Sequence, residues 1–454
     1  MPGQAKESHF VRVLSRREVL MLSFGAMIGW SWVLLTGEWL QAAGTLGTVL
    51  AFAVGGTVVI FIGLTYAELA AAMPTAGGEH VYTMRALGRG PSFVCTWALV
   101  MGYVTVPVFE SVALPTAVEY LFPGLKLGYL WSLQGSEVYL SFVGVGVAGA
   151  LLMTLINIIG IKTAALLQTL ITVMFFLVGL VFLFGAFTHG EAANTEPLIV
   201  NGIAGSLSVL IMVPALMVGF DIIPQSAEEI DLPSELIGKL LVFSVFMAVA
   251  WYACISLAVA YSLDARGLAN STMGTADAMA AVWGGSWAGK LLVIAGIGGI
   301  LTSWNAFIIG GSRVLWALAH SGMLPAAFAE LHPRFNTPYR GVLLIGFLSC
   351  VSPFFGRTIL VWLIDAGSFA IVIAYGMVAL SFLVLRHREP DMPRPFKVRH
   401  GSVVGGIAVV LSVALASLYL PWSPSALVWP YEWAMVLGWS AFGAILYVCV
   451  GRRA

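Results

Sequence analysis

Charge is scarce in this 454-residue sequence: aspartate, glutamate, lysine and arginine make up 10% of it, against about 25% in a typical soluble domain. So few charges cannot cover a water-facing surface, whereas a bilayer core penalises each central charge by about 2.5–3.5 kcal/mol. The 59% of hydrophobic residues and the 50 glycines suit a lipid environment. The composition predicts an integral membrane protein, and its net charge of zero predicts no nucleic-acid partner.

Catalytic and metal-binding motifs are also missing. The four cysteines lie in apolar runs without a CxxC spacing, and the seven histidines lie in loops, tails or helix ends without an HExxH pair. The sequence contains neither a G-x-S-x-G elbow nor a phosphate-binding loop. We therefore expect no enzyme activity, no resident cofactor and no ATP-driven transport.

Apolar runs long enough to cross a bilayer, about 17–25 residues each, recur along the whole chain. Because these runs are continuous and do not alternate, they predict helices and exclude a β-barrel. Twelve membrane helices are expected near residues 18–41, 45–72, 91–121, 137–159, 163–187, 202–227, 237–262, 287–319, 339–354, 358–385, 402–420 and 430–451. An all-α, multi-pass membrane protein is the predicted fold class.

The placement of positive charge supports this count. With twelve helices, 18 of the 22 lysines and arginines fall on one side of the membrane, and 4 (Lys126, Arg266, Lys290 and Arg357) fall on the other. Lysine and arginine concentrate in cytoplasmic loops. The sequence therefore predicts a cell-membrane protein with both termini in the cytoplasm.

Two of the predicted helices contain helix-weakening residues in mid-span. The first reads Gly25-Ala26-Met27-Ile28-Gly29-Trp30-Ser31, and the sixth reads Gly219-Phe220-Asp221-Ile222-Ile223-Pro224. Glycine packing and a simple proline kink would each explain one of these segments. Matched interruptions five helices apart, with an intramembrane acid in one of them, favour instead a transporter site between inverted repeats.

Several segments resemble the amino acid, polyamine and organocation family. They are Pro74-Thr75-Ala76-Gly77-Gly78-Glu79-His80-Val81-Tyr82, Gly219-Phe220-Asp221 with Ala227-Glu228-Glu229, Ser312-Arg313 with Ser321-Gly322-Met323-Leu324-Pro325, and Arg394-Pro395-Phe396-Lys397-Val398. The resemblance implies a leucine-transporter-like fold of two inverted five-helix repeats with broken helices 1 and 6. It divides the chain into an N-tail (1–17), a first repeat (18–201), a second repeat with a cytoplasmic loop (202–400) and helices 11 and 12 (401–454).

The resemblance also implies where a substrate would bind. In that fold, exposed backbone groups of the two breaks face the substrate, and the residues implied here are Met27, Gly29, Trp30, Ser31, Val218, Gly219, Phe220 and Asp221. The tryptophans in Gly29-Trp30-Ser31-Trp32 depart from the small residues that are usual where an α-amino acid carboxylate binds.

Glu110 lies in the middle of the third predicted helix. An intramembrane acid of this kind could bind a substrate cation, carry a coupling proton or pair with a polar neighbour. An aromatic-rich site with one acid suits an amine, so an amine or amino alcohol is an alternative to an amino acid.

The coupling ion is open between sodium and a proton. Proton-coupled relatives often carry a lysine where this chain has Phe175, and Leu301-Thr302-Ser303 resembles a segment of sodium-coupled members of the wider fold. The resemblance implies a sodium site made by the carbonyls of Gly25, Ile28 and Gly299 and the hydroxyls of Thr302 and Ser303. Alternatively, these hydroxyls bond only to carbonyls of their own helix, and Glu110 or Asp221 carries a proton.

Together these observations predict a secondary active transporter that moves a small amino acid or related amine by alternating access. An exchanger, and less favourably a channel, are the alternatives. The expected partners are a small-molecule substrate and membrane lipid.

Overall fold

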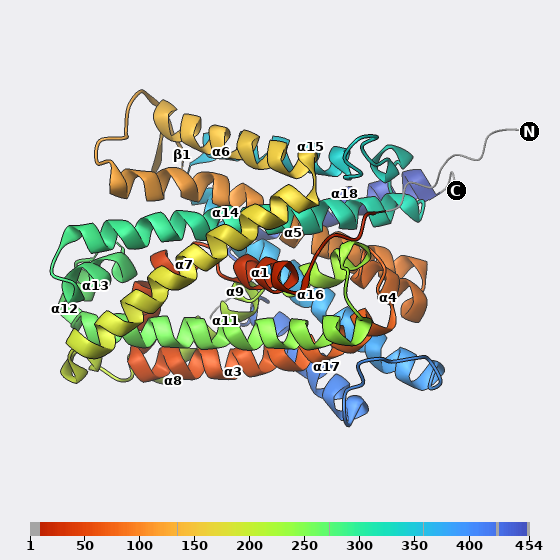
Figure 1. Cartoon of the computed structure of the whole chain (residues 1–454), viewed down its shortest axis with the longest axis horizontal. Helices are drawn as coiled ribbons and strands as arrows, with labels where there is room; N and C mark the ends of the chain where they lie inside the picture. The colour runs from red at the N-terminus through yellow and green to blue at the C-terminus, as the bar shows by residue number, and fades with distance from the viewer. Residues whose placement is uncertain (1–9, 134, 272, 357, 424–425, 452–454) are drawn as a thin grey trace, which may run out of the picture.

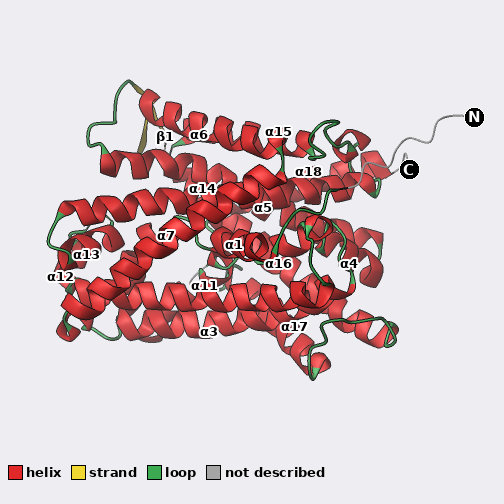
Figure 2. Ribbon diagram, viewed as in Figure 1, coloured by secondary structure: helices red, strands yellow, loops and turns green. Residues whose placement is uncertain are grey.

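The structure is a computed structural model that describes residues 10–133, 135–271, 273–356, 358–423 and 426–451. More than half of the predicted N-tail, residues 1–9, lies outside the described residues. Helices dominate the fold, and loops are short (Figure 2). The chain enters and leaves the helical bundle at the same end, on the right in Figure 1.

Within the described ranges, nine helices are long and apolar enough to cross a bilayer. They are α3 (Thr36–Ala72), α5 (Arg89–Leu121), α6 (Leu140–Ile159), α7 (Ile161–His189), α11 (Ser234–Ser262), α14 (Ser286–His320), α16 (Thr358–Arg388), α17 (Gly401–Leu418) and α18 (Tyr431–Gly451). Each matches one of the twelve predicted spans, so nine of those spans are long helices here.

The other three predicted spans, 18–41, 202–227 and 339–354, are interrupted or short. The first contains α1 (Arg16–Met27), α2 (Ser31–Leu34) and the beginning of α3. The second contains α8 (Gly202–Leu210), α9 (Val213–Leu216), α10 (Ile222–Gln225) and the 3-10 turn η2 (Ala227–Glu229). The third contains α15 (Tyr339–Val351) and η4 (Ser352–Phe355).

The remaining elements are short connections between the spans. They are α4 (Glu79–Leu87), α12 (Ala265–Ala269), α13 (Gly274–Val282), η1 (Ala192–Thr195) and η3 (Ala326–Ala329).

Gly44 separates the first predicted span from the second, although α3 runs through both. Its φ of 75° and ψ of 175° are not helical. A Cβ at this position would lie 2.7 Å from the carbonyl oxygens of Pro197 and Leu198. Because glycine alone combines this conformation with so close an approach of another backbone, the kink at Gly44 ends the first span.

The prediction of an entirely helical chain is wrong at one hairpin. Strands β1 (Tyr129–Leu133) and β2 (Ser136–Tyr139) pair antiparallel and precede α6, which starts at Leu140 and not at residue 137. Strand β1 contains Tyr129 and Trp131, and β2 contains Val138 and Tyr139, residue types that favour extended backbone. This hairpin lies at the upper left in Figure 1, beside the start of α6.

Burial divides the long helices into inner and outer ones. The most apolar windows of α5 and α14 are 78% and 83% buried, whereas that of α18 is 6% buried. Helix α1 packs against α14, α7 and α11, and Figure 1 shows it in the middle of the bundle. Outer helices such as α7 expose leucine and phenylalanine side chains, among them Leu166, Leu170 and Phe184. Such a surface suits lipid contact, whereas residues 217–221, between α9 and α10, are all buried.

Candidate functional site

The first interruption covers Ile28, Gly29 and Trp30. Helix α1 ends at Met27, and Ile28 has a φ of −103° and a ψ of 72°, outside the helical range. The chain becomes helical again at Ser31. The interruption predicted in the first span is therefore present in the structure, at the predicted residues.

The second interruption covers residues 217–221, between α9 and α10. Gly219 has a φ of 132°, and a Cβ there would lie 2.7 Å from the Cβ of Ala26 and 2.9 Å from the backbone nitrogen of Met27. Only glycine adopts this φ without strain and lets the backbones approach so closely. The second interruption therefore lies against the last residues of α1, immediately before the first interruption.

Tyr252 of α11 holds the first interruption from the side. Its hydroxyl donates to the carbonyl oxygen of Met27 at 2.9 Å and lies 2.8 Å from the hydroxyl of Ser31. It thus bridges the last residue of α1 and the first residue of α2. The sequence analysis did not find Tyr252, because its partners are more than 220 residues away along the chain.

The aromatic residues of the predicted site point in different directions. The ring of Trp30 is buried against Gly296 of α14. The ring of Phe220 packs between Tyr66 and Tyr375, at centroid distances of 5.2 and 5.3 Å. The missing side chain at Gly296 leaves room for the ring of Trp30, because a Cβ there would lie 2.4 Å from it.

Glu110 of α5 reaches the first interruption. Its side chain is buried, and the hydroxyl of Ser303 on α14 donates to Oε1. A Cβ at Gly29 would lie 3.0 Å from the same oxygen and 3.1 Å from the Ser303 hydroxyl. Oε2 has no hydrogen-bond partner among the described residues. A carboxyl group with one free oxygen therefore adjoins the interrupted backbone.

The predicted sodium ligands also lie together. A Cβ at Gly299 would lie 2.6 Å from the carbonyl oxygen of Gly29 and 3.2 Å from that of Ile28, and a Cβ at Gly25 would lie 3.3 Å from the Cβ of Thr302. These residues of the first predicted span and of α14 therefore lie close together, and the sodium site stays a prediction.

The hydroxyls of this group also make bonds within their own helix. The Thr302 hydroxyl donates to the Gly299 carbonyl at 3.0 Å, and the Ser303 hydroxyl lies 3.0 Å from the same oxygen, which is an alternative acceptor to Glu110 Oε1. Each hydroxyl oxygen retains lone pairs for a cation after donating its hydrogen. These internal bonds are therefore compatible both with a sodium site and with hydroxyls that serve only their own helix.

A chain of buried amides supports this region, and most of it was not predicted. Asn157 donates to the Asn305 side chain at 2.9 Å, Asn305 donates to Gln168 at 2.9 Å, and Gln168 donates to the Leu22 carbonyl at 3.4 Å. The chain crosses from α6 through α14 and α7 to α1. Polar amides in apolar spans join helices in this way, and that signal could have identified Asn157 and Asn305.

Aromatic rings surround Phe175, which stands where proton-coupled relatives often carry a lysine. Phe175 is buried and contacts Phe24, Trp32 and Trp251 at centroid distances of 6.2, 6.4 and 6.1 Å. No cationic side chain is part of this aromatic cluster. In the described part of the chain, no group of three or more histidine, cysteine or acidic side chains could hold a metal.

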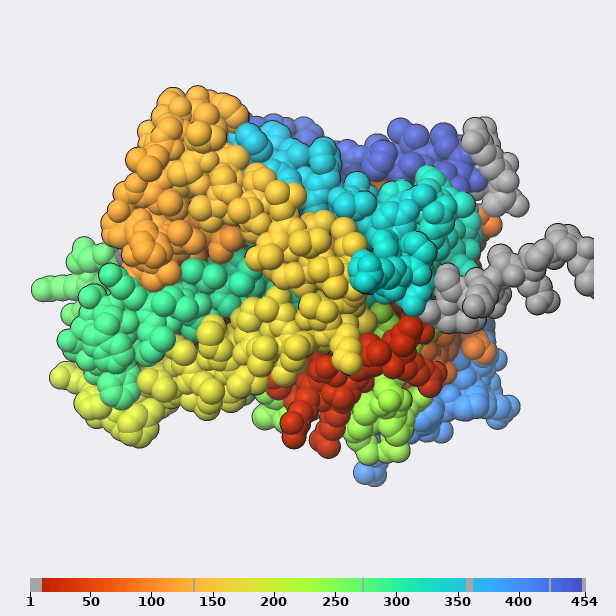
Figure 3. Space-filling model, turned by 45° about the horizontal axis from the view of Figure 1, so that its top comes forward, coloured from red at the N-terminus to blue at the C-terminus, as the bar shows by residue number. Residues whose placement is uncertain are grey.

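Residues of two of the family-like motifs form an ion pair at the end of the bundle where the chain begins. Arg313 of α14 makes two hydrogen bonds to Glu229 at 2.7 and 2.9 Å, with both side chains at most 3% exposed. The backbone N–H groups of Val13 and Leu14 donate to the Glu229 carbonyl, both at 2.9 Å. Figure 3 shows this first part of the described chain, in red, lying on the surface beside a segment coloured light green.

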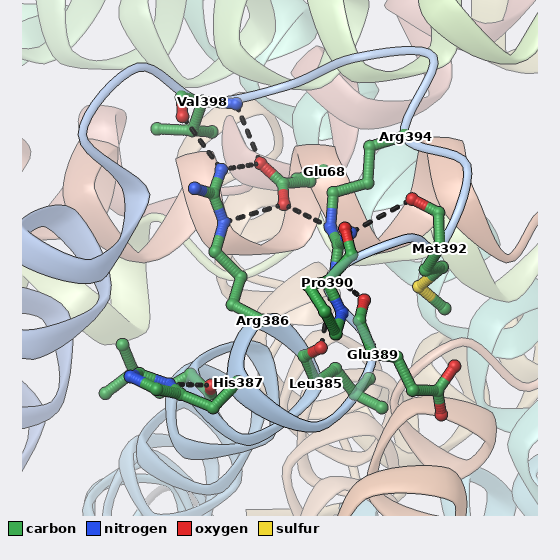
Figure 4. A network of polar contacts seen from close by, with 10 residues as sticks. Glu68, Leu385, Arg386, His387, Glu389, Pro390, Met392, Arg394 and Val398 are labelled. Atoms are coloured by element: carbon green, nitrogen blue, oxygen red, sulfur yellow. Dashed lines mark hydrogen bonds and ion pairs between the residues drawn. The ribbon is translucent and has the colours of Figure 1, made fainter.

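A second family-like motif, the segment before helix 11, binds Glu68 near the C-terminal end of α3. Glu68 is buried, and both of its oxygens are bound by Arg386 and Arg394 at 2.5–3.0 Å (Figure 4). The backbone N–H of Val398 also donates to Glu68 at 2.7 Å. Arg394 and Val398 belong to the segment that resembled the family before helix 11, so this motif ties the loop to α3.

An exposed ion pair lies next to this network. Arg85 donates two hydrogen bonds to Glu389 at 3.0 and 2.6 Å, and these bonds lower the pKa of the Glu389 carboxyl.

The chain forms an apolar bundle in which two interrupted helices lie close together among buried polar groups. Irregular backbone at membrane depth is tolerated only inside the protein or around a cavity. This arrangement is typical of multi-pass membrane transporters. The family follows from comparison with known proteins. The family model described as "Amino acid permease" matches residues 14–451, and the chain belongs to this family. The resemblance seen in the motifs is thereby confirmed.

Several curated relatives match over nearly the full length. The chain is 24% identical to a branched-chain amino acid permease of Bacillus subtilis, over 98% of this chain and 94% of that protein. It is 23% identical to the methylthioribose transporter of the same organism, over 100% and 96%. It is 28% identical to the vacuolar cationic amino acid transporter 8 of Arabidopsis thaliana, over 85% and 65%. The substrates named for these relatives differ from one another.

Proposed function

We propose that this chain is a secondary active transporter of a small amino acid or a related amine, working by alternating access in the cell membrane with both termini in the cytoplasm. The observation that carries the proposal is that the second interruption lies beside the first, because Gly219 packs against Ala26 and Met27 at the end of α1. Interrupted helices expose backbone N–H and carbonyl groups, which can bind the charged ends of a small zwitterion inside a membrane.

The arrangement of the long helices supports two inverted repeats. Helix α3 packs on α11, and α5 packs on α14. In a twelve-helix count with five-helix repeats these are helices 2 and 7 and helices 3 and 8, which are corresponding members of the two repeats. The two interrupted spans correspond in the same way, and the site lies where the repeats meet.

Glu110 favours a substrate that carries a positive group near Gly29. The carboxyl is buried, adjoins the interruption and has one oxygen without a hydrogen-bond partner among the described residues. A substrate ammonium would supply the missing donor, and a charge-assisted hydrogen bond of this kind contributes about 1.5–3 kcal/mol. A cationic amine or amino alcohol without a carboxylate is therefore the second candidate substrate class.

For the coupling ion we propose sodium at Gly25, Ile28, Gly299, Thr302 and Ser303. The group offers carbonyl and hydroxyl oxygens, which are the ligands of hard cations. The structure brings Gly299 to the carbonyls of the first interruption and Thr302 to Gly25. Sodium bound there would join helix 1 to α14 and so link ion binding to the shape of the substrate site.

Two experiments test the proposed function. The first is a thermal-shift screen of the purified protein with leucine, arginine, methylthioribose and simple amines, because a ligand of the folded state raises the melting temperature. The second is uptake of the best ligand into proteoliposomes with an imposed sodium gradient. Accumulation above the outside concentration supports transport, whereas flux that only follows the substrate gradient and fails to saturate supports a channel.

A further inference from the structure

The family-like motif before α17 has no part in the proposed transport. It belongs to residues 389–400, a loop that joins the membrane spans α16 and α17. Both ends of this loop therefore lie where a span leaves the bilayer. From its first turn on, α17 also exposes apolar side chains, with Val403 at 62% and Val410 at 67%. A surface suited to lipid tails thus begins directly beside the loop.

Buried contacts fix the shape of the loop on its inner side. Both backbone groups of Val398 are bound, because its N–H donates to Glu68 at 2.7 Å and its carbonyl accepts from Arg386 at 2.8 Å (Figure 4). The side chain of Val398 is buried as well. The ring of Phe396 packs against α11, where a Cβ at Gly238 would lie 2.8 Å from it. Phe396 and Val398 therefore hold this stretch against the helices.

Lys397 and Arg399, on either side of Val398, are exposed. Side chains held inward at 396 and 398, with exposed ones at 397 and 399, alternate as they do along an extended strand. Within the described residues, neither Lys397 nor Arg399 takes part in an ion pair or a side-chain hydrogen bond. Two cations without an acid partner are therefore held at the membrane edge by the buried contacts of their neighbours.

The loop and the end of α16 carry more positive than negative charge. Residues 386–400 contain five arginines and lysines against two acids, Glu389 and Asp391. Glu389 is already paired with Arg85 at 2.6 Å. Asp391 is exposed and forms no ion pair in the described part of the chain. One free acid cannot neutralise this excess.

The acids on α3 and α11 beside the loop are already paired. Glu68 of α3 is shared by the guanidinium groups of Arg386 and Arg394, so this buried network keeps one positive charge in excess. On α11, Glu235 is paired with Lys239 at 2.6 Å. The loop surface therefore attracts anions, and a guanidinium group binds phosphate through two parallel hydrogen bonds.

We propose that Lys397 and Arg399 bind the phosphate of an anionic membrane lipid whose tails lie along the exposed face of α17. A lipid fits both parts of this surface, because it carries a phosphate at the membrane edge and apolar chains below it. Basic side chains near a bilayer surface attract anionic headgroups within about one Debye length, roughly 8 Å at physiological salt. A free phosphate ion would use the two cations alone. The inference requires only that α16 and α17 span a bilayer, and it does not depend on the transported substrate.

Native mass spectrometry of the purified full-length protein tests this site, with equal amounts of phosphatidylglycerol and phosphatidylcholine added in detergent. The wild type should retain phosphatidylglycerol as its first bound lipid. Since each basic residue contributes about fivefold to the preference for an anionic lipid, Lys397→Gln combined with Arg399→Gln should lower this preference about 30-fold. The matched control combines Arg266→Gln and Lys290→Gln, two exposed basic residues on α12 and near the start of α14, and it should keep the preference.

Three results would overturn the proposal. One is a wild type that binds the two lipids equally. Another is a loss of preference that is no larger in the Lys397 and Arg399 variant than in the control. The third is displacement of the lipid by inorganic phosphate but not by chloride at the same ionic strength, which would assign the two cations to a free phosphate ion.

The melting temperature separates lipid binding from folding. Because Lys397 and Arg399 have no bonds to lose within the described residues, their double variant should melt with the wild type. A much lower melting temperature would show that these side chains support the fold, and it would count against the lipid site. The ligand-induced thermal shift of the transport proposal is a separate measurement, so either proposal can fail without the other.

Discussion

At the scale of single residues, Gly219 has the strictest requirement. Its φ of 132° and its contacts with Ala26 and Met27 leave no room for a side chain. The structure thus explains why a glycine stands at this point of the sixth predicted span. The sequence identified the residue as a helix breaker but did not show that the opposite helix lies against it.

Replacing Gly219 by alanine should therefore impair both folding and ligand binding. Backbone strain of this kind costs about 1–3 kcal/mol, and the new Cβ would also push α1 away. We expect a lower melting temperature and loss of the ligand-induced thermal shift. The matched control is Gly144→Ala, because a Cβ at Gly144 meets nothing within 4 Å and alanine favours the helix. Equal effects of the two substitutions would contradict this account.

Glu110 decides between the two substrate classes. If its free oxygen binds a substrate ammonium, Glu110→Gln should weaken binding of a cationic ligand by about 1.5–3 kcal/mol, or about 10- to 100-fold. Isothermal titration with the best ligand of the screen measures this change. Ser303→Ala is the control that keeps the charge, and it should weaken binding less. An affinity unchanged by Glu110→Gln would remove Glu110 from the substrate site.

At the scale of elements, the sequence predicted where two membrane helices are interrupted, which helix propensity alone does not show. The glycines of the first and sixth spans marked both interruptions, because unwound backbone is rare in a membrane helix and needs special residues. The ninth span was expected to be short, and it is α15 followed by a 3-10 turn. The hairpin β1–β2 was missed because its apolar residues merge with those of α6.

The polar partners of the site were harder to predict. Tyr252 and the amides of Asn157 and Asn305 act across different helices. Their contacts depend on how the helices are rotated, which a single sequence with no pairing information does not specify. By contrast, Thr302 and Ser303 were identified from a local motif, and in the structure Thr302 lies beside Gly25 and Ser303 beside Gly29.

The end of the second interrupted span is held by the buried pair of Arg313 and Glu229. Removing one partner of a buried ion pair costs about 3–5 kcal/mol, because the other charge is left without compensation. Arg313→Met should therefore lower the melting temperature strongly, and the double substitution with Glu229→Gln should recover part of it. Lys239→Met breaks an exposed pair with Glu235 and should cost about 0.3–0.5 kcal/mol. Similar losses for Arg313→Met and Lys239→Met would contradict this role.

At the scale of the whole molecule, the ion should act on the substrate site through α14. If sodium binds at Thr302 and Ser303, added sodium should raise the melting temperature of the wild type and strengthen the thermal shift produced by the ligand. Thr302→Val should abolish both effects, while Thr188→Val, at the exposed end of α7, should preserve them. A wild-type protein that is indifferent to sodium at constant pH would exclude the sodium site.

The two halves of the chain meet at the interruptions, and this meeting point is the basis of the proposed transport. The inner helices α5 and α14 supply the acid and the hydroxyls that line it, while the outer helices face lipid. Alternating access then requires one half to move against the other around a bound solute.

The most direct measurement is an experimental structure of the protein in lipid nanodiscs with the best ligand of the thermal-shift screen. The account predicts density for that ligand between residues 28–30 and 217–221, within hydrogen-bond distance of the backbone in both stretches. Continuous helices through both stretches, or a ligand bound elsewhere with packed side chains between Gly29 and Gly219, would contradict it.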